Sequence, residues 1–332
     1  MLRVFKVWWP ALSFTIVLLA FNCSDSKTSK VLSGEYYGQT PPDTIPALFA
    51  PGIISDGMNN RDMTFSPAGD EFFYSIWLPK RSGIIMYARR INEIWGLPEV
   101  APFSGKYSDI EPCFSSDGRK VYFVSNRPVD TLENVGDYNI WYVSRDDLGW
   151  ERPRIIEKAV NSDLDEFYPS QAGNGNLYFT AAHQGSEDIY VSRLVNGRYG
   201  EPERLSESIN SDKGEFNAMI APDESFLIFS SYGRKDDNGG GDLYISFHNE
   251  DGSWTPAKNM GEPFNFNRLD YCPGLSYDGK YLFFTSSRLS SNLLSGSCGS
   301  FKELKQIFRS PQNGYDDIYW VDAGIIAKYR EK

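Results

Sequence analysis

The sequence predicts an all-β protein that folds as a single β-propeller of five four-stranded blades. The first observation is a phrase of two apolar runs around a tight turn, which recurs at intervals of roughly 50 residues, the length of one blade with loop insertions. Its turn holds Gly in four copies and Glu224 in one, and glycine supplies the backbone freedom that a tight hairpin needs. The copies are FSPAGDEFFYS (65–75), FSSDGRKVYFVS (114–125), QAGNGNLYFTA (171–181), IAPDESFLIFSS (220–231) and LSYDGKYLFFTS (275–286).

A third and a fourth strand are expected after each pair of runs. The third is a short segment rich in aromatic and β-branched residues, which favour strands: GIIMYARR, YNIWYVSR, EDIYVSR, GDLYISF and DDIYWVD. The fourth follows an aromatic residue and a proline, and proline is tolerated there because an outer strand is an edge strand. These signals are Trp95/Pro98, Trp150/Pro153, Tyr199/Pro202 and Trp254/Pro256.

The fifth copy has no fourth strand after it, and the missing strand is expected at the other end of the chain. Residues 46–56, PALFAPGIISD, match 153–163, PRIIEKAVNSD, at the proline, the apolar pair and the final Ser-Asp. We therefore predict that an N-terminal strand closes the last blade, which leaves the ring without a long exposed edge. The propeller spans 44–325, and 326–332 form a C-terminal tail. Six blades are the alternative and would require one that the repeats do not reveal.

The composite pattern NSD..EFYPS…DG.LYF.S…G..DIY.S…G.W..P resembles the WD-repeat-like β-propellers of bacterial envelope proteins, the class that includes the TolB propeller. The resemblance covers about residues 44–325. It implies a propeller fold and a role in the envelope, in the periplasm or at the outer membrane. It implies no particular activity, since propellers host many unrelated functions.

Residues 1–22 are predicted to be a lipoprotein signal peptide. Arg3 and Lys6 precede an apolar stretch, 11–21, that is too short to span a membrane. The segment Leu19-Ala20-Phe21-Asn22-Cys23 is similar to a lipoprotein signal that ends at a lipidated Cys23; an ordinary signal peptide that leaves a free cysteine is the alternative. Residues 23–43 are polar and rich in Ser and Gly, and are expected to form a flexible tether.

The formal net charge of −11 makes nucleic acid an unfavourable partner, so none is expected. Attachment to the membrane is expected to come from acyl chains on Cys23. Outside the cytoplasm a disulfide is permitted, and Cys272 and Cys298 lie in one blade and could pair. Cys113 is expected to be a small buried apolar residue.

Long insertions separate the second and third strands of three blades, at 127–139, 233–242 and 289–317. The last contains SFKELKQIF, which predicts a short helix. Because strand directions alternate within a blade, these insertions share a face with the loops that lead into the first strands. Loops on a rigid scaffold commonly carry binding sites, so we expect function on this face.

Two columns of polar residues are the candidate ligand-binding site at the mouth of the central channel. They could contact a ligand or pair between neighbouring blades, and recurrence in nearly every blade favours a structural role. The first column leads into the innermost strands and comprises Asn60, Asp109, Glu166, Glu215 and Asp270. The second follows the second strands and comprises Arg127, His183, Arg234 and Arg288.

Metal and catalytic signals are weak. The loop with Asp236, Asp237 and Asp242 is a candidate for Ca²⁺, but it lacks the spacing of an EF-hand, and a solvated acidic loop is the alternative. No cofactor is expected. The sequence contains no G-x-S-x-G, no H-E-x-x-H and no paired C-x-x-C motif.

These observations favour a lipid-anchored, non-enzymatic scaffold that binds an envelope protein or a glycan. The alternative is a carbohydrate-active propeller that uses the carboxylates at the channel mouth. A glycoside hydrolase is the only enzymatic class retained, since it needs two carboxylates that flank one bond.

Overall fold

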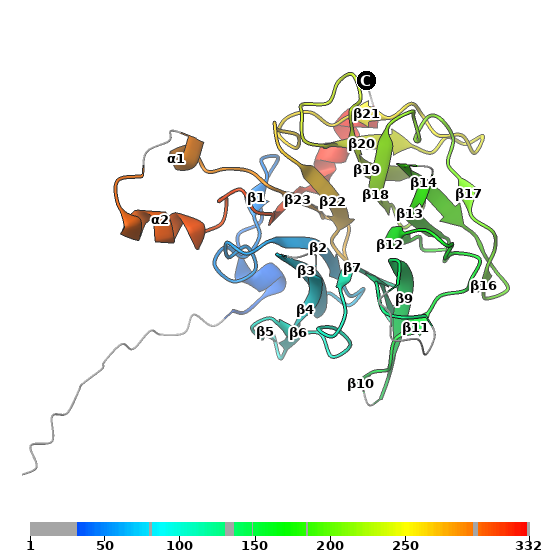
Figure 1. The fold of residues 1–332 in the computed structure, drawn as a ribbon, viewed down its shortest axis with the longest axis horizontal. Coiled ribbons are helices and arrows are strands. Elements are labelled where there is room, and N and C mark those ends of the chain that lie inside the picture. Colours follow the sequence, from blue (N-terminus) through cyan, green and yellow to red (C-terminus); the bar gives the residue numbers. More distant parts are fainter. Residues whose placement is uncertain are drawn as a thin grey trace, which may run out of the picture. The chain divides into compact units, whose positions relative to one another are not determined.

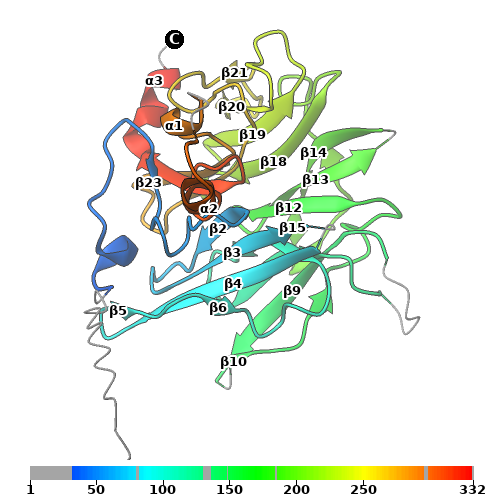
Figure 2. The same ribbon diagram turned by 60° about the vertical axis from the view of Figure 1, so that its left-hand side comes forward.

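The computed structural model describes residues 32–79, 82–129, 136–147, 149–183, 185–294 and 298–330. Five antiparallel sheets are arranged around a central axis (Figures 1 and 2), which confirms the predicted five-bladed propeller. The innermost strands, β2, β7, β12, β18 and β22, each contact the next, and β22 contacts β2 to complete the ring. Among the residues described, no helix combines the length and the hydrophobicity that crossing a bilayer requires.

Each blade runs outward from its innermost strand. Blade 1 contains β2 (Asn60–Phe65), β3 (Glu71–Leu78), β4 (Ser82–Ile91) and β6 (Glu99–Val100), with β5 (Ile94–Trp95) paired to β4. Blade 2 contains β7 (Asp109–Phe114), β8 (Lys120–Ser125), β9 (Asn139–Asp146) and β11 (Arg154–Ile155), with β10 (Gly149–Trp150) paired to β9. Blade 3 contains β12 (Glu166–Gln171), β13 (Leu177–His183), β14 (Ser186–Ser192) and β17 (Glu203–Arg204), beside the hairpin of β15 (Leu194–Val195) and β16 (Arg198–Tyr199).

Blade 4 contains β18 (Gly214–Ile220), β19 (Phe226–Tyr232), β20 (Asp242–Phe247) and β21 (Lys258–Asn259). Blade 5 contains β22 (Asp270–Leu275), β23 (Tyr281–Ser286), β24 (Asp317–Asp322) and β1 (Ala47–Leu48). The helical elements are η1 (Glu35–Gly38), α1 (Ser291–Leu294), α2 (Phe301–Phe308), η2 (Ala323–Ile326) and α3 (Ala327–Arg330).

The N-terminal strand closes the last blade, as predicted. Ala47 lies opposite Trp320 and Leu48 opposite Tyr319 in an antiparallel pair of β1 with β24. The next residue, Phe49, is fully buried and makes an edge-to-face contact with Trp320 at 5.5 Å between ring centroids. Burial of aromatic surface between the two ends of the chain therefore joins blade 5 to blade 1.

Part of the predicted tether belongs to the folded domain. Tyr36 and Tyr37 of η1 are buried; Tyr37 stacks on Trp95 at 5.2 Å between ring centroids, and the hydroxyl of Tyr36 donates to Asp278. The prediction of a flexible 23–43 is thus wrong for the segment around η1, because two adjacent aromatic rings find a place in the core. The first residue of the predicted C-terminal tail, Ile326, is likewise buried.

A side chain latches the third strand of four blades. Asn161, Asn210 and Asn265 each accept a hydrogen bond from a third-strand N–H and donate to the carbonyl of the same residue. In blade 5 the hydroxyl of Ser55 bonds both groups of Ile318. The fourth strands are only two residues long, so these side chains replace hydrogen bonds that a longer strand would make.

Replacing Asn210 by alanine is expected to lower the free energy of unfolding by about 2 kcal/mol, because the buried N–H of Ile189 loses its acceptor, while the C=O of Ile189 keeps only the bond from the N–H of Leu205. Asn210→Ser keeps a smaller hydrogen-bonding group at this position and is expected to lose about half as much. Urea denaturation followed by tryptophan fluorescence measures both variants. Equal losses in the two would show that the amide does not act as a latch.

Candidate functional site

The first predicted column does not line the central channel. Asn60, Asp109, Glu166, Glu215 and Asp270 begin the innermost strands as expected, but the exposed fraction of each is 0%. The expectation that these five side chains surround the channel mouth is therefore wrong. Their side chains are fully buried, so they do not present a surface to a ligand in the channel.

The acids and arginines of the two columns pair within a blade and not between blades. Arg127 donates to Asp109 at 2.6 Å, Arg234 to Glu215 at 2.8 Å and Arg288 to Asp270 at 3.3 Å. A serine hydroxyl of the second strand accepts from each arginine Nε: Ser125, Ser231 and Ser286. Each guanidinium also donates to a backbone carbonyl, those of Phe103, Ile209 and Phe264.

Aromatic rings, two at Arg234 and three at each of Arg127 and Arg288, complete these arginine cradles. The Arg234 guanidinium lies 5.3 Å from the ring of Phe229 and 4.7 Å from that of Tyr244. Arg288 has the same relation to Phe284 and Tyr319, at 5.2 and 4.8 Å. A buried ion pair needs such additional contacts to offset its desolvation, so in blades 2, 4 and 5 the columns stabilise the blade. His183 ends β13, but its side chain lies outside the described residues.

The candidate calcium loop uses its carboxylates internally. Asp236 accepts from the hydroxyl of Tyr244, Asp237 from the N–H groups of Gly233 and Gly239, and Asp242 from Asn259. Within the described part of the chain, no group of three or more His, Cys, Asp or Glu side chains is placed to hold a metal ion.

The disulfide that the sequence permits between Cys272 and Cys298 is absent. Cys272 is buried in β22, whereas Cys298 is exposed on the insertion before α2. Proximity within one blade did not bring the two thiols together, because the long insertion carries Cys298 away from the sheet.

The side chains that do meet on the axis come from a bulge in every innermost strand. The pairing of each innermost strand with its neighbour shifts register after its second or third residue. The first bulge residue has a positive φ, of 48° to 63°, which costs a non-glycine residue about 1–2 kcal/mol. Bulges re-aim side chains, here toward the axis. The residues are Asp62, Glu111, Tyr168, Asn217 and Cys272.

These five side chains and Arg61 form the axial cluster. Arg61 donates to Asp62 and to Glu111, each at 2.6 Å, and its guanidinium lies 4.8 Å from the ring of Tyr271. The Cys272 thiol donates to Asp62 at 2.7 Å and accepts from the amide of Asn217 at 2.9 Å. All five blades thus contribute to one hydrogen-bonded group, since Tyr168 donates its N–H to Glu111 at 2.7 Å.

The axial cluster holds two carboxylates in different environments. Burial raises the pKa of Glu111 to about 7, while the Arg61 guanidinium acts in the opposite direction. Burial also raises the pKa of the Cys272 thiol, which therefore stays protonated. One oxygen of Asp62, Oδ2, is buried without a hydrogen-bond partner. The cluster can hold a proton near neutral pH and has one unused acceptor.

The repeats concealed this cluster because the five bulge positions carry five different residues, whereas the paired columns repeat. The signal that could have revealed it is variation between the blades: polar residues that differ at equivalent positions of a ring can converge on one ligand. Apolar residues at these positions would have predicted a plain core.

A pocket of about 300 Å³ lies on the axis at the face where the innermost strands end, opposite the face where they begin. All five innermost strands line it. Its wall includes Pro112, Pro169 and Pro273, which follow the bulge residues of three blades. The hydroxyl of Tyr168 donates to the carbonyl of Pro273 at 2.8 Å and so connects blades 3 and 5 beside the axial cluster. Of the residues described as lining this pocket, none is charged.

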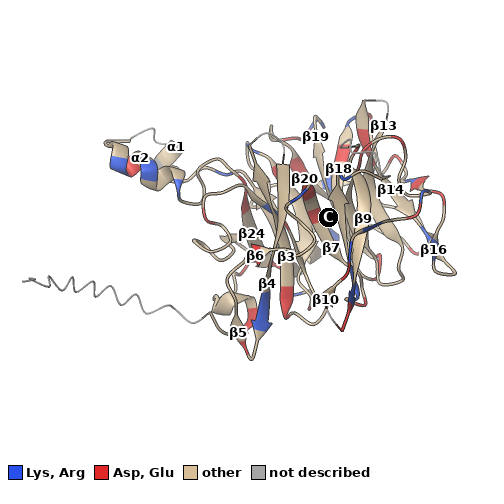
Figure 3. Cartoon of the chain, turned by 60° about the horizontal axis from the view of Figure 1, so that its bottom comes forward, with Lys and Arg blue, Asp and Glu red and all other residues tan. Residues whose placement is uncertain are grey.

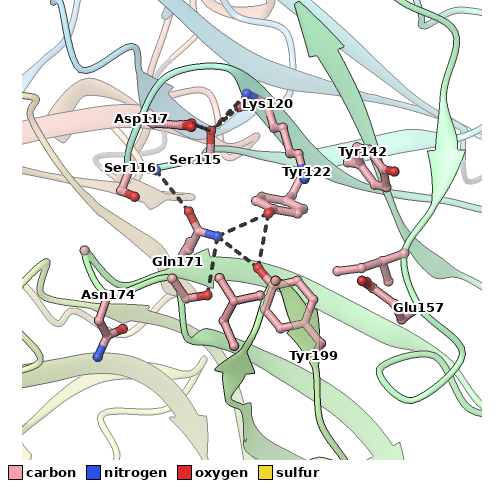
Figure 4. Close-up of a pocket in the computed structure, with 15 residues that line it drawn as sticks. Ser115, Ser116, Asp117, Lys120, Tyr122, Tyr142, Glu157, Gln171, Asn174 and Tyr199 are labelled. Carbon is pink, nitrogen blue, oxygen red and sulfur yellow. Dashed lines mark hydrogen bonds between the residues drawn. The ribbon is translucent and has the colours of Figure 1, made fainter.

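A second pocket, of about 330 Å³, lies between blades 2 and 3 (Figure 4). Gln171 donates to the hydroxyls of Tyr122 and Tyr199, at 3.1 and 2.9 Å, and accepts from the N–H of Ser116 at 3.0 Å. Both amide groups of this glutamine are therefore engaged by the protein, which indicates a contact between blades.

No family model matches the chain, and no curated protein sequence matches it. Solved structures of similar fold include a TolB-type protein from Agrobacterium tumefaciens, with 16% identity, 69% of this chain and 70% of that chain covered, and a TM-score of 0.46. TolB from Acinetobacter baumannii has 13% identity, with 79% and 54% covered and a TM-score of 0.46. The catalytic domain of a GH62 α-L-arabinofuranosidase from Coprinopsis cinerea has 14% identity, with 85% and 97% covered and a TM-score of 0.46. These likenesses concern the fold alone.

Proposed function

We propose that this chain is a lipid-anchored β-propeller of the bacterial envelope that acts as a non-enzymatic binding scaffold, and that α2 docks a partner protein. The observation that carries the proposal is the apolar side of α2. Phe301, Leu304 and Phe308 have exposed fractions of 70%, 50% and 62%, and no residue of the helix is buried.

The helix is preformed and held away from the sheets. Ser300 caps it by accepting the N–H of Glu303, whose carboxylate accepts from Gly299. At the other end, Asn313 donates to the carbonyls of Phe308 and Gly57. An isolated helix of eight residues is not stable in water, so these contacts hold a surface that the propeller itself does not use. Figure 3 shows α2 standing apart from the sheets.

The spacing of the apolar side chains suits a groove on a protein. Phe301, Leu304 and Phe308 stand at positions i, i+3 and i+7, the spacing of anchors that an amphipathic helix inserts into a hydrophobic groove. Lys302 and Lys305 add positive charge, which favours a groove with an acidic rim. Three side chains are too few for stable membrane attachment, so we favour a protein over a lipid surface.

Cross-linking in intact envelopes, followed by reconstitution with the purified partner, tests this docking. The Phe301→Asp/Phe308→Asp variant is expected to weaken binding by about 100-fold, since it removes two central apolar anchors. The matched control is Gln306→Ala, on the side of the helix away from Phe301, Leu304 and Phe308, and it is expected to stay within about threefold of wild type. Equal binding of the partner by wild type and by the Asp variant would refute the proposal. It would also be refuted if the Asp variant lost binding to anionic lipid vesicles and bound the partner protein as wild type does.

The lipid anchor rests on the sequence before the propeller. Labelling with an alkyne analogue of palmitate is expected for wild type and not for Cys23→Ser, and that variant is expected to leave the membrane fraction. Labelling of both would place the acyl chain elsewhere.

The axial cluster supports a second candidate, a carbohydrate-active propeller. Glu111, with a pKa of about 7, can donate a proton beside the carboxyl group of Asp62, and a pair of carboxyl groups is what glycoside hydrolysis uses. Turnover of a glycan by wild type, abolished by Asp62→Asn in a protein that still folds, would replace the scaffold proposal. Retained turnover in that variant would exclude the axial cluster as its site.

A further inference from the structure

Blade 3 keeps the acid of the paired columns without the arginine. Glu166 stands where Asp109, Glu215 and Asp270 stand in blades 2, 4 and 5. Ala181, opposite Glu166 in the pairing of β12 with β13, replaces the serine whose hydroxyl bonds the arginine in those blades. Position 183, which matches Arg127 and Arg288, holds histidine.

The rest of the arginine cradle is present in blade 3. Phe179 and Tyr190 stack with 6.1 Å between ring centroids, as do Phe229 and Tyr244, at 6.0 Å, beside Arg234. Val160 takes the chain position of the residues whose carbonyls accept from the arginines. These residues and Glu166 line a pocket of about 570 Å³, here called the blade-3 pocket.

Glu166 is incompletely satisfied. Its Oε1 accepts from the N–H and the hydroxyl of Ser162, but Oε2 is buried and has no hydrogen-bond partner. Burial raises the pKa of Glu166 to about 7, and the nearby Asp165 and Asp137 add to the shift. An unpartnered carboxylate oxygen inside a protein costs free energy that a bound cation would recover.

Blade 1 shows what the fold does when no cation is supplied. It has no arginine at the equivalent place, and its column residue is the neutral Asn60. A blade without the arginine can therefore fold with a neutral side chain in place of the carboxylate. Blade 3 has retained the charge, the rings and the space. Lys158 lines the same pocket, but among the described residues it forms no ion pair with Glu166, and no arginine of the chain lines the pocket.

We propose that the blade-3 pocket binds a guanidinium group supplied from outside the chain, seated as the arginines of blades 2, 4 and 5 are seated. The planar guanidinium suits two aromatic faces and a carboxylate together better than a compact ammonium does. The site is independent of the docking function proposed for α2, which lies on the other side of the ring from β13 and β14 (Figure 1).

Calorimetric titration of the purified, full-length protein with L-argininamide tests the proposal. Saturable binding is expected, with one site per chain and a dissociation constant below about 10 mM. L-Citrullinamide, an analogue of nearly the same shape whose side chain is uncharged, is expected to bind at least about tenfold more weakly. No saturable binding of argininamide, or equal binding of the two compounds, would overturn the proposal.

Two variants localise the binding. Glu166→Gln is expected to lose at least about tenfold in affinity while it remains folded, since it removes a buried unpaired charge. Ala181→Ser/His183→Arg supplies the missing internal arginine and is expected to abolish binding by filling the pocket. Glu207→Gln, on an exposed loop, is the matched control and is expected to bind as wild type does. Unchanged affinity in Glu166→Gln would place the guanidinium elsewhere and contradict the proposal.

A peptide distinguishes the two possible sources of the guanidinium group, an arginine side chain of another protein and a small free molecule. Tighter binding of an uncharged capped pentapeptide with one central arginine than of argininamide would support a protein side chain as the ligand. Weaker binding of the peptide would support a small free molecule. Both results require that Glu166→Gln reduces the affinity.

Discussion

Replacing Arg61 by methionine is expected to lower the free energy of unfolding by about 3–5 kcal/mol, because it leaves two carboxylates in the axial cluster without their cation. Asp62 and Glu111 are both buried, and Arg61 is the ion-pair partner that the described structure gives to each of them. Methionine keeps much of the volume, so the loss measures charge more than packing. Guanidinium chloride denaturation followed by tryptophan fluorescence gives the difference.

Two further variants separate the buried charge from a general effect of arginine loss. Arg193 pairs with Glu203 on the surface, where both side chains are more than half exposed, and Arg193→Met is expected to cost less than about 1 kcal/mol. Adding Asp62→Asn and Glu111→Gln to Arg61→Met neutralises the stranded carboxylates and is expected to restore much of the stability. Similar losses in Arg61→Met and Arg193→Met would show that the axial cluster does not stabilise the ring.

The architecture was predictable because the sequence pattern of one blade occurs five times in the chain. Each copy of the repeat carries a turn between two apolar runs, and even the exception at Glu224 adopts the positive φ that glycine takes in the other four turns. The closing strand was predictable for the same reason, since 46–56 match a fourth strand of another blade. The short helix before Arg309 was also predicted, and α2 confirms it.

The axial cluster was not predictable by the same reasoning. Its backbone feature, a bulge, leaves no mark in residue type, because Asp62, Glu111 and Cys272 share no property that a repeat search detects. The columns that do repeat belong to internal ion pairs. In a ring of similar blades, repetition identified what holds each blade together, and departure from repetition identified what the blades form jointly.

The chain ends show a different limit. A polar segment rich in Ser and Gly predicts a tether, but Tyr36 and Tyr37 within it fill the space between blade 1 and blade 5. Two adjacent tyrosines in a polar segment were the available signal. The average composition of the segment hides these two residues, whereas its packing against the blades depends on them.

Stability is expected to fall as the pH rises from 5 to 8, by about 2 kcal/mol for each buried carboxyl group whose pKa is raised to about 7. Burial raises the pKa of Glu111, Glu166 and Asp317 to about 7 and that of Asp270 to about 6. In the unfolded chain these groups release their protons near pH 4. Between these values the folded state holds protons that the unfolded state has lost, so each pH increment favours unfolding until the folded groups have ionised as well.

Glu166→Gln isolates one contribution to this slope. Because the variant cannot ionise, it is expected to be about 1–2 kcal/mol more stable than wild type at pH 8 and nearly equal to it at pH 5. Glu207→Gln, which removes an exposed charge, is expected to leave the slope unchanged. A parallel pH profile for wild type and Glu166→Gln would mean that the folded protein already supplies a cation to Glu166, and the blade-3 pocket would then have no place for a guanidinium from outside.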